Sequence, residues 1–349
     1  MSHSAPEMTT PKLSICITTL NRSSFIGVTL ESMLSQLTGE CEVVVLDGAS
    51  TDDTEEVVLA YARHCDRLRY IRQETNNGVD RDYDRAVELA RGEYCWLMTD
   101  DDLLKPGAVS AVLNSLRRDL SLVLVNAEIR DFSLSTVLLS RWLDVESNRA
   151  YRSNDMDRLF VLAADFLKYI GGVVIKRALW LARDRQSFYG SWFIHVGVIF
   201  QEQLPSEVEV MAEPQIILRW GNAHTFSPKV MEILLVTWPS LSGRLAPSES
   251  AKGEVHSLAP WRHFRYLLEL RSLGYYSLKE YRRWFRPKLL SAREKVAPIL
   301  AGILPGVLAN AIFVLYYLIT ADHLRELRLH DLRKCRYYPR NWGSTKPVW

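Results

Sequence analysis

The sequence predicts an α/β protein built on a mainly parallel β-sheet flanked by helices, with a helical extension at its C-terminal end. Short runs of β-branched residues recur every 26 to 29 residues over the first 125 positions. Each run is followed by a turn and then by an amphipathic helical pattern, which is the rhythm of strands joined by crossover helices. Beyond residue 255 the chain changes to helical patterns dense in arginine and aromatic residues, with a long apolar segment among them.

Five strands are expected in the first part, beginning near Leu13, Glu42, Leu68, Tyr94 and Ser121. The helices between them are expected over 25–36, 52–62, 83–90 and 106–116. Ligands of open parallel sheets bind outside the carboxyl ends of the strands. The loops that follow these strands are therefore the first place to look for function.

The rhythm weakens after residue 125. We expect a helix over 155–169, an apolar segment over 192–200, and short strands over 173–176, 208–211 and 215–220. A stretch rich in Ser, Pro and Gly indicates a linker. The predicted organisation is a flexible N-terminus (1–10), one α/β domain (11–238, with halves 11–125 and 126–238), a linker (239–254) and a helical region (255–349).

Charge is divided unevenly along the chain, although the 349 residues sum to a net charge of only +2. Residues 1–120 hold 12 basic and 20 acidic side chains, whereas residues 255–349 hold 17 and 6. A total near zero argues against a nucleic-acid-binding protein. The five cysteines form no CxxC pair and residues 1–12 contain no apolar run typical of a secretory signal, so we expect a cytosolic protein with reduced thiols.

Polar motifs follow three of the expected strands: TTLNR at 18–22, DGASTDD at 47–53 and TDDD at 99–102. Three consecutive carboxylates repel one another unless a cation or several hydrogen-bond donors compensate them, and their hard oxygens suit Mg²⁺ or Mn²⁺. The alternative is a solvated acidic turn before the helix expected at Pro106. Neither GxGxxG nor GxxxxGK[ST] occurs, which argues against a nicotinamide-binding fold or a P-loop. The pattern indicates a nucleotide site in which a divalent ion takes the place of a glycine cradle.

These motifs, together with NNGVDRDYDRAVELARGEY at 76–94 and in this order, resemble family 2 glycosyltransferases of the GT-A fold. Within that family, the segment GVDRDYDRAVELARGEYCWLMTDDD is most similar to the abequosyltransferase-like subgroup, which works on bacterial surface polysaccharides. The resemblance covers residues 11–118 closely and the next hundred loosely. It implies an enzyme that uses a nucleotide-diphosphate sugar, of the CDP, UDP or dTDP type among others, and a Mn²⁺ or Mg²⁺ ion.

Carried onto this sequence, the resemblance implies a nucleotide-sugar site that contains Thr19, Asn21, Arg22, Asp47, Ser50, Asp80, Arg81 and Asp100. It assigns the metal to Asp101, with Asp102 as a further ligand or a supporting group. Asp47 would recognise the base, unless it only caps the following helix. Arg81 would lie near the ribose or diphosphate, unless it only serves solubility on a helix surface. Many family members read Asp-x-Asp-Asp here, and this chain has Thr99 in the first position, so which carboxylate contacts the ion stays open.

Single displacement at the sugar needs a general base for the acceptor hydroxyl. Family members often supply it from a Glu-Asp pair, and this chain contains none. The corresponding region offers His195 in an apolar setting, and Glu202 or Asp184 as alternatives, or else a purely structural His195. Further along, Arg219 and His224 are candidates to close over the diphosphate, although an arginine at a strand end is more often a surface residue.

The apolar stretch 296–319 carries no charge and is long enough to cross a bilayer as one helix. Pro298 and Pro305 interrupt it, and both flanks are basic, so a crossing would place one basic flank outside against the positive-inside rule. An interfacial or re-entrant segment would keep both flanks on anionic headgroups. We therefore expect monotopic or peripheral association with the cytoplasmic face of the inner membrane, with a buried or dimerising helix and a true span as alternatives.

These observations favour a metal-dependent glycosyltransferase that places a sugar on a lipid-linked glycan in O-antigen or related polysaccharide synthesis. The expected partners are the nucleotide-sugar donor, the lipid-linked acceptor, the anionic membrane surface and a second copy through the C-terminal region. Two alternatives stay open. A nucleotidyltransferase acting on sugar phosphates would share the acidic sheet edge, and a non-catalytic nucleotide-sugar-binding membrane scaffold would keep Asp47 without the metal or the base.

Overall fold

The computed structural model describes residues 10–222, 229–255, 263–287 and 291–339. The chain forms two compact units, which we describe separately. The first contains the residues up to Ile129, then Ser140–Arg219 and Leu245–Ala251, and the second contains Arg130–Leu139, Trp220–Arg244 and the residues from Lys252 onward. The expected linker over 239–254 holds helical residues of α9 (Trp238–Ser242) and α10 (Glu249–Val255).

A large twisted sheet forms the centre of the first unit, in the order β3-β2-β1-β4-β10-β6-β11-β9. Its strands are β1 (Leu13–Thr19), β2 (Cys41–Asp47), β3 (Leu68–Arg72), β4 (Tyr94–Met98), β6 (Leu122–Leu124), β9 (Arg149–Tyr151), β10 (Val173–Lys176) and β11 (Val208–Val210). The first four pair in parallel, as the strand spacing predicts. β1 and β2 are buried on both faces, which explains their continuous apolar sequences.

The sequence pattern gave no indication of strand direction in the second half of the domain. β10 lies between β4 and β6 and is antiparallel to both, so β6 does not pair with β4. A smaller sheet brings β5 (Leu103–Leu104), β12 (Ile216–Arg219) and β7 (Ala127–Arg130) together in the order β5-β12-β7. β5 immediately follows the carboxylate run at 100–102. Because β12 is the neighbour of β5 in this sheet, β12 also lies close to that run.

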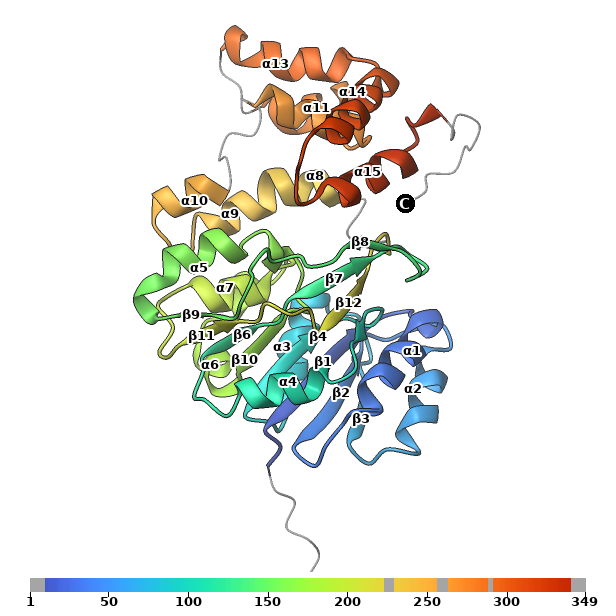
Figure 1. The fold of residues 1–349 in the computed structure, drawn as a ribbon, viewed down its shortest axis with the longest axis vertical. Helices are drawn as coiled ribbons and strands as arrows, with labels where there is room; N and C mark the ends of the chain where they lie inside the picture. Colours follow the sequence, from blue (N-terminus) through green and yellow to red (C-terminus); the bar gives the residue numbers. More distant parts are fainter. Residues whose placement is uncertain (1–9, 223–228, 256–262, 288–290, 340–349) are drawn as a thin grey trace, which may run out of the picture. The chain divides into compact units, whose positions relative to one another are not determined.

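The helices that follow the parallel strands are α1 (Ser23–Leu34), α2 (Thr54–Ala62), α3 (Val79–Leu89) and α4 (Ala108–Ser115), and Figure 1 shows α1 and α2 beside β1–β3. α3 begins four residues earlier than expected. Gly78 directly precedes the helix and has φ of 87°, a conformation that glycine adopts readily. Asp80 and Asp82 lie in the first turn of α3, where the positive end of the helix dipole stabilises carboxylates.

The expected helix at 155–169 is divided into α5 (Met156–Ala163) and a 3₁₀ turn at Phe166–Lys168. α6 (Arg177–Ala182) and α7 (Ile194–Phe200) complete this unit. α7 is the expected apolar segment, and all seven of its residues are buried. It is therefore a core helix, and its first turn carries His195.

The second unit is mainly helical. It contains β8 (Val137–Leu139), α8 (Val230–Glu232), a π-helical turn (Ile233–Thr237), α9, α11 (Phe264–Ser272), α12 (Leu278–Glu280), a second π-helical turn (Tyr281–Phe285), α13 (Ala292–Ile303), α14 (Gly306–Ile319) and α15 (Arg325–Lys334). Its core includes Leu267, Tyr276, Phe285 and Ala301. The apolar stretch 296–319 is two helices, because the chain breaks at Leu304–Pro305 and turns by 90°.

None of the helices in the described ranges is by itself long and apolar enough to cross a membrane. The bent pair α13–α14 reaches that length and composition only when its two members are taken together.

Candidate active site

The carboxyl ends of β1, β2 and β4 meet at one edge of the large sheet. In the register, Thr19 at the end of β1 lies opposite Asp47 at the end of β2. Ile17 lies opposite Met98, the last residue of β4, so the run Asp100–Asp102 begins beside the end of β1. β2 lies on one side of β1 and β4 on the other, which makes this edge a topological switch point, where open α/β sheets bind their ligands.

The loops after β1 and β2 are tied to each other by side chains from both expected motifs. The Asn21 amide oxygen accepts a hydrogen bond from the backbone N–H of Thr51 at 2.7 Å, and the Asn21 N–H donates to the Ser50 hydroxyl at 2.9 Å. Asn21 has φ of 56°, a left-handed conformation that asparagine tolerates better than most residues. Asn21 and Ser50 therefore fix the shape of the two loops.

Asp47 is completely buried at this edge. Its carboxylate accepts hydrogen bonds from the Ser50 N–H at 2.7 Å and from the Tyr70 hydroxyl at 2.6 Å. Burial and this bond to a carboxylate both raise the pKa of Tyr70, so the phenol keeps its proton. Asp47 does not cap α2, which begins at Thr54 after Asp53.

Asp82 adds a carboxylate that the sequence indicated only as a helix start. The Gln73 amide donates to Asp82 Oδ1 at 2.6 Å. A Cβ placed on Gly48 would lie 3.2 Å from Asp82 Oδ2, so this oxygen lies directly against the turn after β2. Burial, opposed by the Gln73 bond, raises the pKa of Asp82. Its buried position follows from the helix starting at Val79, which the charged DRDYD sequence did not suggest.

Asp100 lies in the same loop cluster and faces a cation. Arg22 Nε is 3.5 Å from Asp100 Oδ1, and both side chains are largely buried. Burial and repulsion by Asp101 raise the pKa of Asp100 to about 7, while Arg22 and the Thr19 hydroxyl oppose that shift. Arg22 alone therefore compensates this edge only in part.

Asp102 is surrounded by donors from three parts of the chain. Its carboxylate accepts hydrogen bonds from the Thr99 hydroxyl, from the Tyr169 hydroxyl at 2.8 Å and from the Arg219 N–H at 2.7 Å. Burial and the neighbouring Asp101 nevertheless raise its pKa to about 7. Thr99 thus supports Asp102. The arrangement makes Asp102 a positioning residue that joins β4, β12 and the 166–169 turn.

Asp101 is the most exposed of the three carboxylates, at an intermediate level. Its backbone carbonyl accepts a hydrogen bond from Arg219 Nε at 3.0 Å. The guanidinium groups of Arg219 and Arg22 both lie over the ring of Phe25, at 5.3 and 5.7 Å from its centroid. Two guanidinium groups thus lie beside the carboxylate run, where they can bind an anionic group of a ligand.

The donor set fits a divalent metal ion shared with a phosphate ligand. The described ranges contain no group of three His, Cys, Asp or Glu residues arranged as a complete protein site. Mg²⁺ and similar ions are commonly held by one or two carboxylates together with substrate phosphates. The raised pKa values of Asp100 and Asp102 indicate excess negative charge that such an ion would compensate. Asp101 is the residue best placed to hold it, because Asp102 is occupied by three donors.

Asp80 and Arg81 lie at the start of α3 and contact the segment before α7. The Asp80 carboxylate accepts the backbone N–H groups of Trp192 at 2.9 Å and Ile194 at 3.1 Å. Trp192 has φ of 69°, a strained conformation for an aromatic residue, which this bond helps to hold. Arg81 lies over the Tyr189 ring at 4.5 Å. Asp80 is thus a positioning residue for this segment, a role that the sequence did not suggest because its partners are over 100 residues away.

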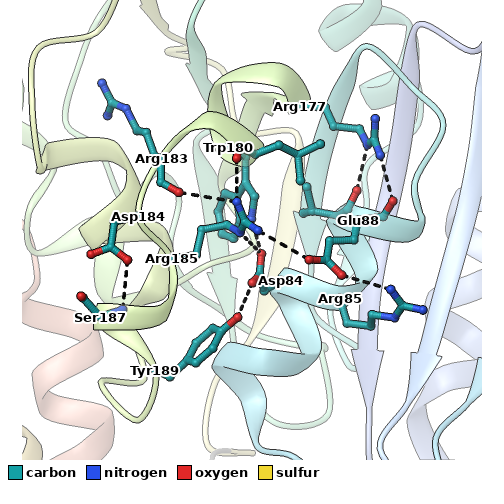
Figure 2. A network of polar contacts seen from close by, with 12 residues as sticks. Asp84, Arg85, Glu88, Arg177, Trp180, Arg183, Asp184, Arg185, Ser187 and Tyr189 are labelled. Atoms are coloured by element: carbon teal, nitrogen blue, oxygen red, sulfur yellow. Dashed lines mark hydrogen bonds and ion pairs between the residues drawn. The ribbon is translucent and has the colours of Figure 1, made fainter.

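Asp84, one helical turn further along α3, joins the same segment to this helix (Figure 2). Figure 2 shows its buried carboxylate facing Trp180, Arg185 and Tyr189. The Trp180 indole donates at 2.9 Å, Arg185 Nε lies at 2.7 Å, and the Tyr189 hydroxyl donates as well. α3 therefore holds the 180–194 segment through two buried carboxylates.

Replacing Asp84 by asparagine is expected to lower the free energy of unfolding by about 1–3 kcal/mol. The reason is that the amide N–H groups of asparagine would face the donor groups of Trp180, Arg185 and Tyr189. Urea denaturation at pH 7 measures this change. Tyr189→Phe removes one donor and should cost about 1 kcal/mol or less. Equal midpoints for Asp84→Asn and the wild type would contradict the anchoring role.

Glu202 and Asp184 lie at the opposite end of α7 from the sheet edge. Glu202 follows the last turn of α7, is 69% exposed and lies 3.5 Å from Arg183 Nε. The Asp184 N–H donates to the Gln201 side chain, and the Gln201 amide donates to the Asp184 carbonyl. Because Asp80 binds the other end of α7, neither carboxylate lies beside Asp100–Asp102.

His195 lies at the near end of α7, but its side chain is 1% exposed. Its Nε2 is 2.7 Å from the Leu167 carbonyl, which only accepts, so Nε2 carries the proton. The basic atom is then Nδ1, which is buried and has no hydrogen-bond partner among the described residues. Burial lowers the pKa of His195 to about 4. This geometry favours the structural alternative for His195, while a role for it as the base stays a prediction.

The low pKa of His195 predicts a specific acid sensitivity. The ring is neutral in the folded chain but charges in the unfolded chain below pH 6.5, so stability falls as pH drops from 6.5 toward 4. At pH 5 this costs about 2 kcal/mol relative to pH 7.5, at 1.36 kcal/mol per pKa unit. His195→Gln keeps a donor for Leu167 without the charge. The stability difference between wild type and variant should shift by that amount between the two pH values, and a constant difference would contradict the assignment.

His224, expected beside Arg219, lies outside the described residues. The described part of the site thus brings together Thr19, Asn21, Arg22, Asp47, Ser50, Asp100, Asp101, Asp102 and Arg219 at one sheet edge, with Asp80 and Arg81 beside it. It leaves Glu202 and Asp184 apart from them. Sequence reasoning missed Tyr70, Gln73 and Tyr169, and of these only Gln73, directly after β3, lies at a strand end that the spacing singled out.

Comparisons with known proteins bear on the family and the fold of the chain. Residues 14–165 match the model of Glycosyl transferase family 2. Abequosyltransferase RfbV of Salmonella typhimurium is 26% identical over 223 residues, which cover 60% of this chain and 67% of that protein. The GalNAc(5)-diNAcBac-PP-undecaprenol beta-1,3-glucosyltransferase of Campylobacter jejuni is 27% identical over 183 residues, or 52% of this chain and 57% of that one.

Among solved structures, residues 1–349 of TarS from S. aureus in complex with UDP align with a TM-score of 0.57. The alignment covers 96% of this chain and 93% of that one at 16% identity, so the likeness concerns the fold. With the switch-point edge, its carboxylates and the family match over residues 14–165, the fold class and enzyme class expected from the sequence are confirmed. Residues 14–165 match the family 2 glycosyltransferases, and the chain has the GT-A fold.

Proposed function

We propose that this enzyme moves a sugar from a nucleotide-diphosphate donor to a lipid-linked glycan in the synthesis of a bacterial surface polysaccharide such as O-antigen. The observation that carries this proposal is the carboxylate run Asp100–Asp102 at the switch point, with Arg22 and Arg219 beside it. An edge that holds both carboxylates and guanidiniums suits a ligand that is a metal-bound diphosphate.

In this proposal each group at the edge has a distinct task. Asp47 and the loops fixed by Asn21 hold the nucleoside, and Asp100 lies near the ribose. Asp101 would hold a Mn²⁺ or Mg²⁺ ion, which would supply positive charge for the leaving diphosphate. Arg22 and Arg219 contribute fixed positive charge to the same leaving group, and Asp102 holds the β12 end that carries Arg219.

We propose single displacement, in which the acceptor hydroxyl oxygen bonds to the anomeric carbon, the bond from that carbon to the diphosphate oxygen breaks, and the hydroxyl proton passes to a general base. The acceptor would approach from the segment around Trp192, whose backbone Asp80 fixes beside the edge. His195 in the following turn orders this segment from inside the core. Its low pKa suits a neutral structural histidine better than a group that takes a proton near pH 7.

A lipid-linked acceptor is supported by the C-terminal region and by the relatives. Residues 255–349 carry 17 basic and 6 acidic side chains, which suits the anionic cytoplasmic face of the inner membrane. One relative is named for its action on a PP-undecaprenol-linked glycan. We therefore propose peripheral or monotopic attachment there, with self-association through the same region as the alternative.

Product analysis tests the reaction type. The purified protein is incubated with Mn²⁺, extracted bacterial membrane lipids and each of a panel of labelled nucleotide sugars. We expect label in the lipid fraction and an equal amount of released nucleoside diphosphate. A nucleotidyltransferase supplied with pyrophosphate would instead convert the nucleotide sugar to nucleoside triphosphate and sugar phosphate in the absence of lipid. Binding of a nucleotide sugar without turnover on any lipid extract would favour the non-catalytic scaffold.

A further inference from the structure

The helices α13 and α14 expose an unusual amount of aliphatic surface. Eight of the sixteen exposed large hydrophobic side chains in the described ranges lie within residues 296–319. They recur at helical spacing, which places them along one side of each helix. We define the outer face as Leu300, Ile303, Leu308, Ile312, Leu315 and Ile319, which are 47–76% exposed. An exposed apolar surface of this extent is uncommon on a monomeric soluble protein.

The inward side of α14 is more polar than its outward side. Asn310 is completely buried and donates to the backbone carbonyls of Ser272 at 3.2 Å and Leu332 at 3.0 Å. The Tyr317 hydroxyl donates to Glu269 at 2.6 Å. The helix thus directs its amide and phenol groups toward α11 and α15 and its leucines outward. The inward side also packs Phe313 against α15, whereas the outward side lacks the polar residues that a helix at a water-exposed surface carries there.

Charge around the outer face favours an anionic bilayer as its occupant. No charged residue occurs between Lys295 and Asp322. Before this interval, Arg282, Arg283 and Arg293 are exposed, and Arg283 lies over the Trp284 ring at 4.7 Å. An aliphatic face bordered by exposed arginines and an aromatic side chain matches the boundary between headgroups and acyl chains.

The break between the two helices argues against a crossing by this segment as one straight helix. α13 and α14 are bent by 90° at Leu304–Pro305, and their twelve and fourteen residues are each shorter than the ~20 that a transmembrane helix needs. The inward side of α14 is also joined to α11 and α15 by the bonds of Asn310 and Tyr317. The pair is therefore built to lie on a surface.

We infer that the outer face of α13–α14 inserts into the interfacial layer of an anionic bilayer and is the membrane-docking surface of this enzyme. This inference deepens the proposed membrane location by naming the surface, but it does not depend on the sugar or the acceptor. Aliphatic side chains supply the insertion, and the arginines before α13 supply the attraction to anionic headgroups.

The test is flotation of the full-length protein with vesicles of phosphatidylcholine and phosphatidylglycerol at 7:3, and with phosphatidylcholine alone. The triple variant Leu300→Gln, Leu315→Gln, Ile319→Gln reduces the aliphatic surface with a helix-compatible residue. The matched control Val28→Gln, Leu59→Gln, Val161→Gln changes three exposed apolar residues on α1, α2 and α5. Thermal unfolding and binding of a nucleotide sugar with Mn²⁺ are measured on every variant.

We expect the lipid concentration for half-binding to rise at least ~10-fold in the triple variant and to stay unchanged in the control. The variant Arg282→Gln, Arg283→Gln, Arg293→Gln should weaken binding to the mixed vesicles only. Equal flotation of all variants would overturn the inference. It would also be overturned if light scattering showed a changed molar mass for the triple variant while its flotation stayed the same, because that outcome assigns the face to a second copy. Unchanged donor binding alongside lost flotation would leave the proposed reaction standing.

Discussion

Asp101→Asn is expected to reduce turnover about 10³-fold while leaving the free energy of unfolding within about 0.5 kcal/mol of the wild type. The reason is that Asp101 is the more exposed carboxylate of the run and is best placed to hold the metal ion beside the diphosphate. The amide has nearly the same shape but loses the charge that a divalent ion needs. Initial rates at saturating donor, measured across a range of Mn²⁺ concentrations, check this result.

Asp119→Asn serves as the control, because Asp119 is a carboxylate just before β6 that pairs with Lys176 and lies away from the carboxyl ends of the strands. Its turnover should equal that of the wild type. Excess Mn²⁺ should restore Asp101→Asn in part if the defect is weaker metal binding. Normal turnover of Asp101→Asn at low Mn²⁺ would remove this residue from the metal site.

Asp102→Asn is expected to act mainly on stability, lowering the free energy of unfolding by about 2–4 kcal/mol. Asp102 accepts hydrogen bonds from Thr99, Tyr169 and Arg219. The amide nitrogen of asparagine is itself a donor, so it cannot accept any of these bonds. Denaturation midpoints with urea for the apo protein give the change. Activity should fall as well, because the β12 end that carries Arg219 would shift.

Tyr169→Phe separates the contributions within this cluster. It removes one donor from Asp102 and is expected to cost about 1–1.5 kcal/mol. The double variant with Asp102→Asn should then lose less than the sum of the two single changes, because they act on the same bond. Additive losses, or a stable Asp102→Asn, would show that Asp102 does not hold the strand ends together.

Most of the fold in the first 125 residues could be predicted because its signals are local. β1 and β4 occupy the expected positions because β-branched runs and helix patterns repeat with nearly constant spacing. The direction of β10 could not be predicted, because four residues of sequence VVIK carry no information about their partners. The same limit applies to the 90° bend after α13. Prolines indicated a break there but not its angle.

The site shows the same division between local and long-range information. Residues at or just beyond strand ends, such as Asp47 and Asp100, lie where the parallel-sheet rule places them. The roles of Asp80 and Asp102 depended on partners far along the chain, at Trp192 and Tyr169. The burial of His195 was equally hidden, since a histidine in an apolar sequence is compatible with either an open site or a core.

Calorimetric titration of nucleotide sugars into the wild type and Asp101→Asn, each with and without Mn²⁺, tests the central claim most directly. We predict that sugars linked to one nucleotide base bind the wild type with Mn²⁺, and that binding weakens at least about 10-fold when either the metal or the Asp101 carboxylate is removed. Equal affinity in all four combinations would contradict a metal-dependent donor site at this edge of the sheet.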